Sequence, residues 1–208
     1  MSDADGWWQE ANDLDVASYA AIAATPTPVL DRFFRRLSQA ADHSKLWLGS
    51  AAALAIFGGS RGRRSAVNGL AATAVTSAVV NFALKPLADR CRPDRALHRV
   101  PTARHVSMPT STSFPSGHAA SAAAFAAGVA RAFPETAIPL STAAALVAYS
   151  RVHTGVHYPA DVIAGTLTGT TLAQLVVPLL DQGRKRRTVA RLAGYRDGDR
   201  ARSAAESC

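Results

Sequence analysis

Three short motifs in this chain carry side chains that suit the handling of a phosphate group. Written as patterns, they are K-x6-R-P from Lys85 to Pro93, P-S-G-H from Pro115 to His118, and S-R-x5-H-x3-D from Ser150 to Asp161. A phosphomonoester is a dianion, and its charge must be neutralised before a nucleophile approaches the phosphorus atom. The motifs supply both the cations and the nucleophiles that this chemistry requires.

The predicted phosphate-binding residues come from all three motifs. Lys85, Arg92 and Arg151 provide three cations. A guanidinium group matches phosphate oxygens in a bidentate manner, whereas an ammonium group acts as a mobile point charge. Ser116 and Gly117 immediately precede an alanine-rich run, so we expect their backbone N–H groups to lie at a helix N-terminus. Unpaired donors and the helix dipole favour an anion there.

Two histidines are available for attack and proton transfer. His157 has Asp161 four residues later, and Pro159 between them suits the first turn of a helix. A nearby carboxylate fixes the tautomer of an imidazole and stabilises the positive charge that develops when the other ring nitrogen attacks phosphorus. We therefore predict that His157 is the nucleophile, that Asp161 orients it, and that His118 is the general acid and base.

Each of these residues also has an ordinary structural explanation when it is taken alone. A basic residue beside an apolar stretch commonly anchors a helix at a membrane interface, and a histidine at a helix start is commonly a cap or a core residue. Asp161 also suits the first turn of a helix because of the helix dipole. The joint occurrence of the motifs favours the catalytic interpretation. Structural roles are expected for the residues outside the fixed motif positions, namely His153, Tyr158, Arg90, Arg95, His98, Arg99, Arg104 and His105.

The three motifs, in this order and with every signature position filled, resemble the type 2 phosphatidic acid phosphatase (PAP2) family. Its superfamily also contains class A bacterial acid phosphatases and vanadium haloperoxidases. The resemblance implies a phosphohistidine on His157, orientation of that ring by Asp161, and acid and base chemistry by His118. It also implies phosphate contacts from Lys85, Arg92, Ser116, Gly117 and Arg151.

The composition favours a membrane protein of one domain, residues 1–208. Charged residues make up 18% of the chain, below the roughly 25% of soluble domains, while the apolar residues reach 48%. The net charge of +8 suits an anionic membrane surface or a phosphate ligand. No aromatic stripe interleaves the basic residues, so no nucleic-acid partner is expected.

Cys91 and Cys208 are too far apart in sequence to suggest a disulfide, and no cluster has metal-ligand spacing. We expect a metal-independent enzyme without a cofactor.

The apolar pattern predicts an all-α fold, a membrane-embedded bundle of about five transmembrane helices. An amphipathic helix is expected to begin near Thr27 and Pro28 and to lie in the membrane interface. Five apolar segments follow, at residues 46–57, 67–84, 119–133, 138–149 and 162–180. Only the second and fifth clearly reach the roughly 17–25 residues of a spanning helix. Gly165 and Gly169, one helical turn apart, are expected to permit close helix packing.

The remaining segments are polar. Residues 1–15 are acidic and lack the pattern of a signal peptide, which counts against a secreted acid phosphatase. Residues 93–113 have no helical periodicity and are expected to form a loop that faces the substrate. Residues 181–208 are expected to form a charged, flexible tail.

The basic residues predict the orientation of the chain in the membrane. If the segment 46–57 runs into the cytoplasm, the arginines in a loop at 61–64 and those at 184–187 both lie on the cytoplasmic side. All three motifs then meet on the extracytoplasmic side of the cell membrane.

Three functions compete at this point. The first is a membrane phosphatase that acts on a lipid phosphate or on a polyprenyl phosphate or pyrophosphate. The second is a vanadate-dependent haloperoxidase, although such enzymes are typically larger and soluble. The third is a non-enzymatic protein that binds anionic lipid, but charge alone would suffice for binding and would not require His118, His157 and Asp161. The sequence favours the phosphatase and leaves its lipid headgroup and its oligomeric state open.

Overall fold

Helices account for all the regular structure in residues 3–206, the part of the chain that the computed structural model describes, with side chains described for residues 6–188. The predicted all-α class is confirmed. The helices are α1 (Asp3–Ala24), α2 (Pro28–Ala40), α3 (Lys45–Phe57), α4 (Gly59–Val79), α5 (Lys85–Leu87), α6 (Gly117–Ala130), α7 (Ala137–His153) and α8 (Pro159–Glu206). Shorter helical turns are η1 (Asp42–Ser44), η2 (Val80–Leu84), η3 (Thr102–Arg104) and η4 (Pro134–Thr136).

The five apolar segments all form helices, namely α3, α4 with η2, α6, α7 and α8. Two regions, Gly59–Leu87 and Pro159–Thr188, are long and apolar enough to cross a bilayer by themselves. The helices α3, α6 and α7 have 13, 14 and 17 residues. A transmembrane helix needs about 20 residues. The number of spans, expected to be about five, therefore stays a prediction.

The corner between α3 and α4 differs from the expectation of a basic loop. The arginines at 61, 63 and 64 lie in the first turns of α4. A Cβ atom on Gly62 would lie only 2.1 Å from the carbonyl oxygen of Leu54, so only glycine permits this tight corner. Arg64 and Arg184 both pair with Asp181, at 2.8 and 3.0 Å. The basic start of α4 therefore lies beside the basic stretch of α8.

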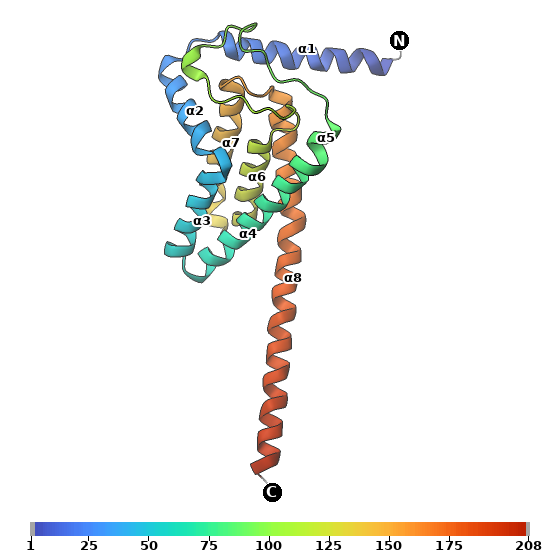
Figure 1. The fold of residues 1–208 in the computed structure, drawn as a ribbon. Helices are drawn as coiled ribbons and strands as arrows, with labels where there is room; N and C mark the ends of the chain where they lie inside the picture. Colours follow the sequence, from blue (N-terminus) through green and yellow to red (C-terminus); the bar gives the residue numbers. More distant parts are fainter. Residues whose placement is uncertain (1–2, 207–208) are drawn as a thin grey trace.

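Helix α6 lies at the centre of the bundle, in contact with α4, α7 and α8 (Figure 1). Six of its fourteen residues are buried alanines, which lets neighbouring helices approach closely. A Cβ atom on Gly165 would lie 2.4 Å from the carbonyl oxygen of Ser116, and one on Gly169 would lie 2.0 Å from that of Ala120. These distances confirm that the two glycines permit close helix packing. They fix the start of α6 against the first turns of α8.

Helix α1 lies across one end of the bundle, whereas α8 continues far beyond the other end (Figure 1). The polar N-terminal segment is helical from Asp3, which its composition did not predict. Tyr19 attaches α1 to the bundle, because it is 1% exposed and its ring packs edge-on against those of Tyr158 and His98. The expected tail continues α8 as a helix to Glu206, and residues 207–208 lie outside the described residues.

A buried ionic cluster joins α1, α2 and α7. Arg104 donates from Nε to Asp31 Oδ1 at 2.8 Å, and His153 Nε2 lies 3.0 Å from the same oxygen. Arg104 also donates to the carbonyl oxygens of Ile22 and Thr25 near the end of α1, at 3.0 and 2.6 Å. Arg104 and His153 thus have the structural roles expected of them, and the middle of the 93–113 loop is fixed against α1 and α2.

Candidate active site

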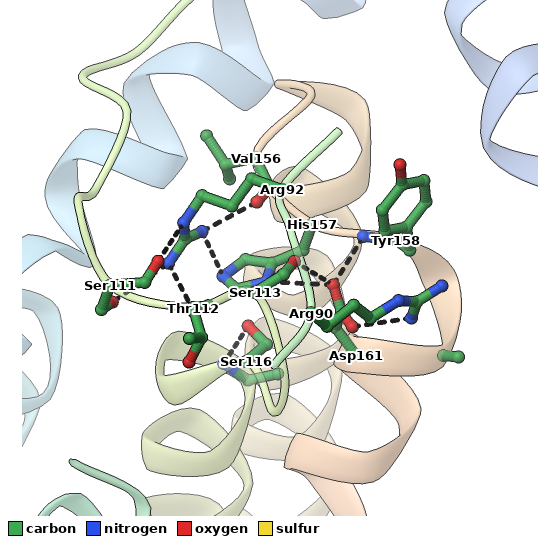
Figure 2. Close-up of polar contacts among 12 residues, drawn as sticks. Arg90, Arg92, Ser111, Thr112, Ser113, Ser116, Val156, His157, Tyr158 and Asp161 are labelled. Carbon is green, nitrogen blue, oxygen red and sulfur yellow. Dashed lines mark hydrogen bonds and ion pairs between the residues drawn. The ribbon is translucent and has the colours of Figure 1, made fainter. Parts of the chain in front are cut away.

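The predicted nucleophile, His157, lies in the short connection between α7 and α8 and is 1% exposed. Its Nδ1 lies 3.4 Å from Asp161 Oδ2 and 3.4 Å from Ser113 Oγ, and its Nε2 lies 3.2 Å from Nη1 of Arg92 (Figure 2). A guanidinium group only donates hydrogen bonds. Nε2 is therefore the acceptor, and Nδ1 carries the proton toward Asp161. This tautomer leaves the lone pair of Nε2 on the side of the phosphate-binding cations.

Asp161 is held in place from several directions. It lies in the first turn of α8, because Pro159 begins the helix as its position predicts. Oδ2 accepts hydrogen bonds from the backbone N–H of Tyr158, at 2.9 Å, and from the hydroxyl of Ser113. Oδ1 accepts from Nη1 of Arg90 at 2.8 Å (Figure 2). With its oxygens fixed in this way, the carboxylate has one orientation toward the imidazole.

Arg90 has a different environment from the one expected of a purely structural residue. Besides Asp161, its guanidinium pairs with Asp15 of α1 at 2.6 Å and lies 4.4 Å from the ring centroid of Tyr158. Ser113 is tied to the same place, since its N–H donates to the carbonyl oxygen of Arg90 at 2.8 Å. Neither residue occupies a fixed motif position, so the motif spacing alone gives no signal for them.

Lys85 and Arg92 are brought together by the end of the 93–113 loop. Lys85 Nζ donates to Ser111 Oγ at 2.9 Å, and Arg92 Nε donates to the carbonyl oxygen of Ser111 at 2.8 Å. Arg92 also donates to the carbonyl oxygens of Thr112 and Val156, at 3.1 and 2.8 Å (Figure 2). The last residues of the loop therefore face the site, while Arg104 in its middle faces away.

Arg151 lies near the end of α7 and is 1% exposed. Its Nη1 donates to the hydroxyl of Ser38 in α2 and lies 3.9 Å from Asp42 Oδ1. Its Nε is buried and has no hydrogen-bond partner among the described residues. A buried cationic donor without an acceptor is costly, and an anion bound here would satisfy it.

The P-S-G-H motif forms the N-terminus of α6, as predicted. Ser116 is the N-cap, and its Oγ accepts from the N–H of Ala119 at 3.5 Å. The N–H of Ser116 differs from the expectation of a free donor, because it already donates to the carbonyl oxygen of Asp161 at 2.9 Å. Gly117 and His118 follow in the first turn of α6, and His118 Nε2 lies 2.9 Å from Asp42 Oδ1. The serine of this motif therefore joins α6 to α8.

Part of the motif set lines one cavity of about 220 Å³, whereas Ser116, Arg151 and Asp161 lie behind its wall. Its lining contains the motif residues Lys85, Arg92, Gly117, His118 and His157. Trp47 of α3 and Ser77 of α4 complete part of its wall. Among residues 6–188, whose side chains the structure describes, no group of three or more His, Cys, Asp or Glu side chains is placed to hold a metal ion. The arrangement suits an anion that is contacted by cations and faces one histidine from each of two segments.

Burial sets the protonation of His157. Removal from water disfavours the imidazolium and is the main reason that the pKa of His157 falls to about 4. The hydrogen bond to Asp161 opposes this effect, and the charges of Arg92 and Arg151 add to it. The ring is therefore neutral at physiological pH, as a nucleophile must be.

Comparisons with known proteins point to one family. The model of the PAP2 superfamily matches residues 66–185 of this chain. The decaprenylphosphoryl-5-phosphoribose phosphatase of Mycobacterium tuberculosis is 34% identical over 163 residues, which cover 76% of this chain and 87% of that protein. The lipid A 1-phosphatase of Rhizobium etli is 35% identical over 102 residues, 47% of this chain and 43% of that protein. The undecaprenyl-diphosphatase of Sulfolobus acidocaldarius is 42% identical over 76 residues, 36% of this chain and 37% of that protein.

Two solved structures share the fold. The PAP2 type phosphatidylglycerolphosphate phosphatase from Bacillus subtilis aligns with a TM-score of 0.64 and 24% identity, over 84% of this chain and 87% of that one. The LpxE protein of Aquifex aeolicus aligns with a TM-score of 0.64 and 26% identity, over 78% of this chain and 93% of that one. In both cases the alignment spans most of the helical bundle.

Proposed function

The chain belongs to the PAP2 superfamily of phosphatases, and on this basis we propose that it is a membrane enzyme that removes the terminal phosphate of a lipid phosphate or of a polyprenyl phosphate or pyrophosphate through a phosphohistidine. The observation that carries the proposal is the state of His157. Its Nδ1 faces Asp161, and its Nε2 faces Arg92 beside the cavity. A neutral imidazole with its free lone pair among cations is prepared to attack a phosphoryl group.

Substrate binding first redistributes the hydrogen bonds of Arg92. A phosphate oxygen is a stronger acceptor for a guanidinium group than a neutral imidazole nitrogen. Arg92 therefore moves its Nη1 hydrogen bond from His157 to the phosphate, which frees the attacking nitrogen. Lys85 and Arg151 neutralise the other oxygens, and the unpaired Nε of Arg151 gains its acceptor.

The chemistry then proceeds in two displacements. Nε2 of His157 forms a bond to phosphorus while the bond from phosphorus to the lipid oxygen breaks, and that oxygen takes a proton from His118. The positive charge on the phosphorylated ring is stabilised by Asp161. A water molecule next attacks phosphorus and gives a proton to His118. The bond from phosphorus to nitrogen breaks, its electron pair returns to Nε2, and inorganic phosphate leaves.

The size of the cavity suits the phosphoryl end of a substrate rather than a whole small molecule. About 220 Å³ is less than the roughly 300–1,000 Å³ of pockets that enclose a whole small molecule. The phosphoryl end would enter while the chain stays in the bilayer. Among lipid phosphates, decaprenylphosphoryl-5-phosphoribose is the first to test, because the relative named for it is matched over 87% of its length.

The placement of basic residues supports an extracytoplasmic site in the cell membrane. Lys85 follows the end of α4 with η2, and His118 and Asp161 lie in the first turns of α6 and α8, so the motifs meet at one end of the bundle. Arg64 and Arg184 meet at Asp181 in the region where α4 begins. Basic residues prefer the cytoplasmic side of a membrane protein, which puts the motifs on the opposite side.

The proposal is tested by phosphate release from a lipid panel in mixed micelles, with His157→Ala as the main variant. The panel contains decaprenylphosphoryl-5-phosphoribose, phosphatidic acid, phosphatidylglycerol phosphate and undecaprenyl pyrophosphate. His157→Ala should abolish turnover of every substrate, and wild-type enzyme quenched in alkaline detergent should carry an acid-labile, alkali-stable phosphoryl group that this variant lacks. The matched control is His105→Ala. Nε2 of His105 lies 3.1 Å from the carbonyl oxygen of Val100 in the loop. Substantial turnover by His157→Ala would refute the phosphohistidine.

The role of His118 has its own test. His118→Ala should slow release of an alkoxide strongly, by about 10²–10⁴-fold, because the departing oxygen then lacks a proton donor. A substrate with a very acidic leaving group needs no such donor and should recover part of the rate. Failure of every leaving group to restore activity would mean that His118 has another role.

A further inference from the structure

A carboxylate that belongs to none of the three motifs lies against the acid and base histidine. Asp42 is in η1, the corner between α2 and α3, and its Oδ1 lies 2.9 Å from Nε2 of His118. The same oxygen lies 3.9 Å from Nη1 of Arg151. Across residues 6–188, whose side chains are described, Asp42 is the only carboxylate that contacts His118.

The backbone of this corner has an unusual conformation. His43 and Ser44 follow Asp42 with φ values of 54° and 59°, in the left-handed region that non-glycine residues seldom occupy. Two consecutive residues keep such a conformation only where the surrounding structure imposes it, and conformations of this kind cluster at functional sites. His43 and Ser44 also line the cavity that contains His118. The corner thus holds Asp42 at the edge of the site.

The surroundings of His118 make a nearby anion necessary. Lys85 from α5 and Arg92 from the following loop line the same cavity as this ring, as does His157. Arg151 from α7 lies 3.9 Å from the Asp42 oxygen that His118 contacts. Three cations oppose the protonated form of an imidazole, yet a general acid must be protonated when the substrate binds. His43, the remaining titratable side chain in the cavity lining, adds no negative charge. Asp42 supplies the opposing charge at hydrogen-bond distance.

We propose that Asp42 is a positioning residue for His118 and does for the acid and base what Asp161 does for the nucleophile, an inference that rests on the proposed function. The Nε2–H group of His118 donates to Asp42, which leaves Nδ1 as the nitrogen that gives its proton to the departing oxygen and later takes one from water. The carboxylate comes from outside the residues that the superfamily model matches, which begin at 66. The corner between α2 and α3 is therefore part of the catalytic arrangement.

The test compares pH profiles of kcat/KM in the full-length protein in mixed micelles. This parameter reports only the steps up to departure of the leaving group, so hydrolysis of the phosphoenzyme does not enter. With a long-chain alkyl phosphate, Asp42→Asn should lower kcat/KM by about 10- to 100-fold, a part of the 10²–10⁴-fold that general acid catalysis supplies. The basic limb of the profile should move to lower pH by about one to two units, because an opposing charge within hydrogen-bond distance is lost. Asp42→Glu, which keeps the charge, should restore the limb.

A second substrate separates this role from a structural one. An amphiphilic nitrophenyl phosphate with a long alkyl chain has an acidic leaving group, so its kcat/KM should change by less than about threefold in Asp42→Asn. Asp89→Asn, an exposed aspartate in the loop after α5, is the matched control and should behave as wild type with both substrates. Asp42→Ala provides a second removal of the carboxylate, and thermal unfolding checks that each variant is folded.

The outcomes distinguish a failure of the role proposed for Asp42 from a failure of the proposed function. Equal losses for both substrates with an unchanged pH profile, or no loss in Asp42→Asn and Asp42→Ala, would overturn the role of Asp42. Full turnover by His118→Ala and His157→Ala, measured in the same experiment, would instead overturn the proposed function whatever Asp42 does.

Discussion

The contact between α6 and α8 predicts a large effect from a very small substitution. A Cβ atom on Gly169 would lie 2.0 Å from the carbonyl oxygen of Ala120, whereas real Cβ atoms essentially never approach closer than 3.0 Å. The nearest atoms are backbone atoms of a buried helix, so no flexible side chain can yield. Gly169→Ala must therefore move α6 and α8 apart by about 1 Å.

This displacement should affect stability and catalysis together. Overpacking of a well-packed core costs about 1–3 kcal/mol. Ala120 lies two residues after His118, and Gly169 lies two helical turns after Asp161, so the same shift separates the acid from the nucleophile that Asp161 orients. A misplacement of about 1 Å between catalytic groups can lower the rate about 10²-fold. We expect Gly169→Ala to lower kcat by about that factor and to lower the free energy of unfolding by about 1–3 kcal/mol.

The assay uses purified variants in mixed micelles, with unfolding followed by titration with a denaturing detergent and kcat measured from phosphate release. Gly183→Ala is the matched control, because it lies in the same helix and a Cβ there would meet nothing within 4 Å. This control should keep full activity and gain up to about 1 kcal/mol, since alanine is the better helix former. If Gly169→Ala unfolded and turned over like Gly183→Ala, the helix contact would not govern the site.

Three further predictions concern the reaction. Burial lowers the pKa of His157 to about 4, so the ring becomes protonated only when the pH approaches that value. We therefore expect kcat/KM for an aryl phosphate to persist down to that pH, after correction for ionisation of the substrate. An acidic limb centred near the ordinary histidine value of about 6.5 would contradict this. Phosphate release should survive EDTA and be inhibited by orthovanadate, which mimics five-coordinate phosphorus; loss of activity in EDTA that magnesium restores would refute a metal-independent mechanism. Shortening the acyl or prenyl chain should lower kcat/KM strongly, since the chain helps position the phosphoryl group, and equal efficiency toward p-nitrophenyl phosphate would refute lateral entry from the bilayer.

The sequence alone determined the helices and the residues of the motifs. Apolar runs specify helices locally, so all five expected segments appear, and Pro159 and Ser116 mark the starts of α8 and α6 as their residue types predict. The pair of His157 and Asp161 was also predictable, because residues four apart on a helix or its first turn lie close together. Local pattern was less informative for the N-terminus, where a polar composition did not predict α1.

Tertiary structure decided which groups surround each catalytic side chain. Arg90 reaches Asp161 across 71 positions of the sequence, and Asp42 reaches His118 across 76. No spacing rule links residues so far apart, because their contact depends on how α1, η1 and the 93–113 loop pack over the end of the bundle. The same packing pairs the N–H of Ser116 with the carbonyl oxygen of Asp161, although its position at a helix N-terminus predicted a free donor. Helical propensity and residue chemistry act over a few residues, whereas hydrogen-bond partners and burial are properties of the packed chain.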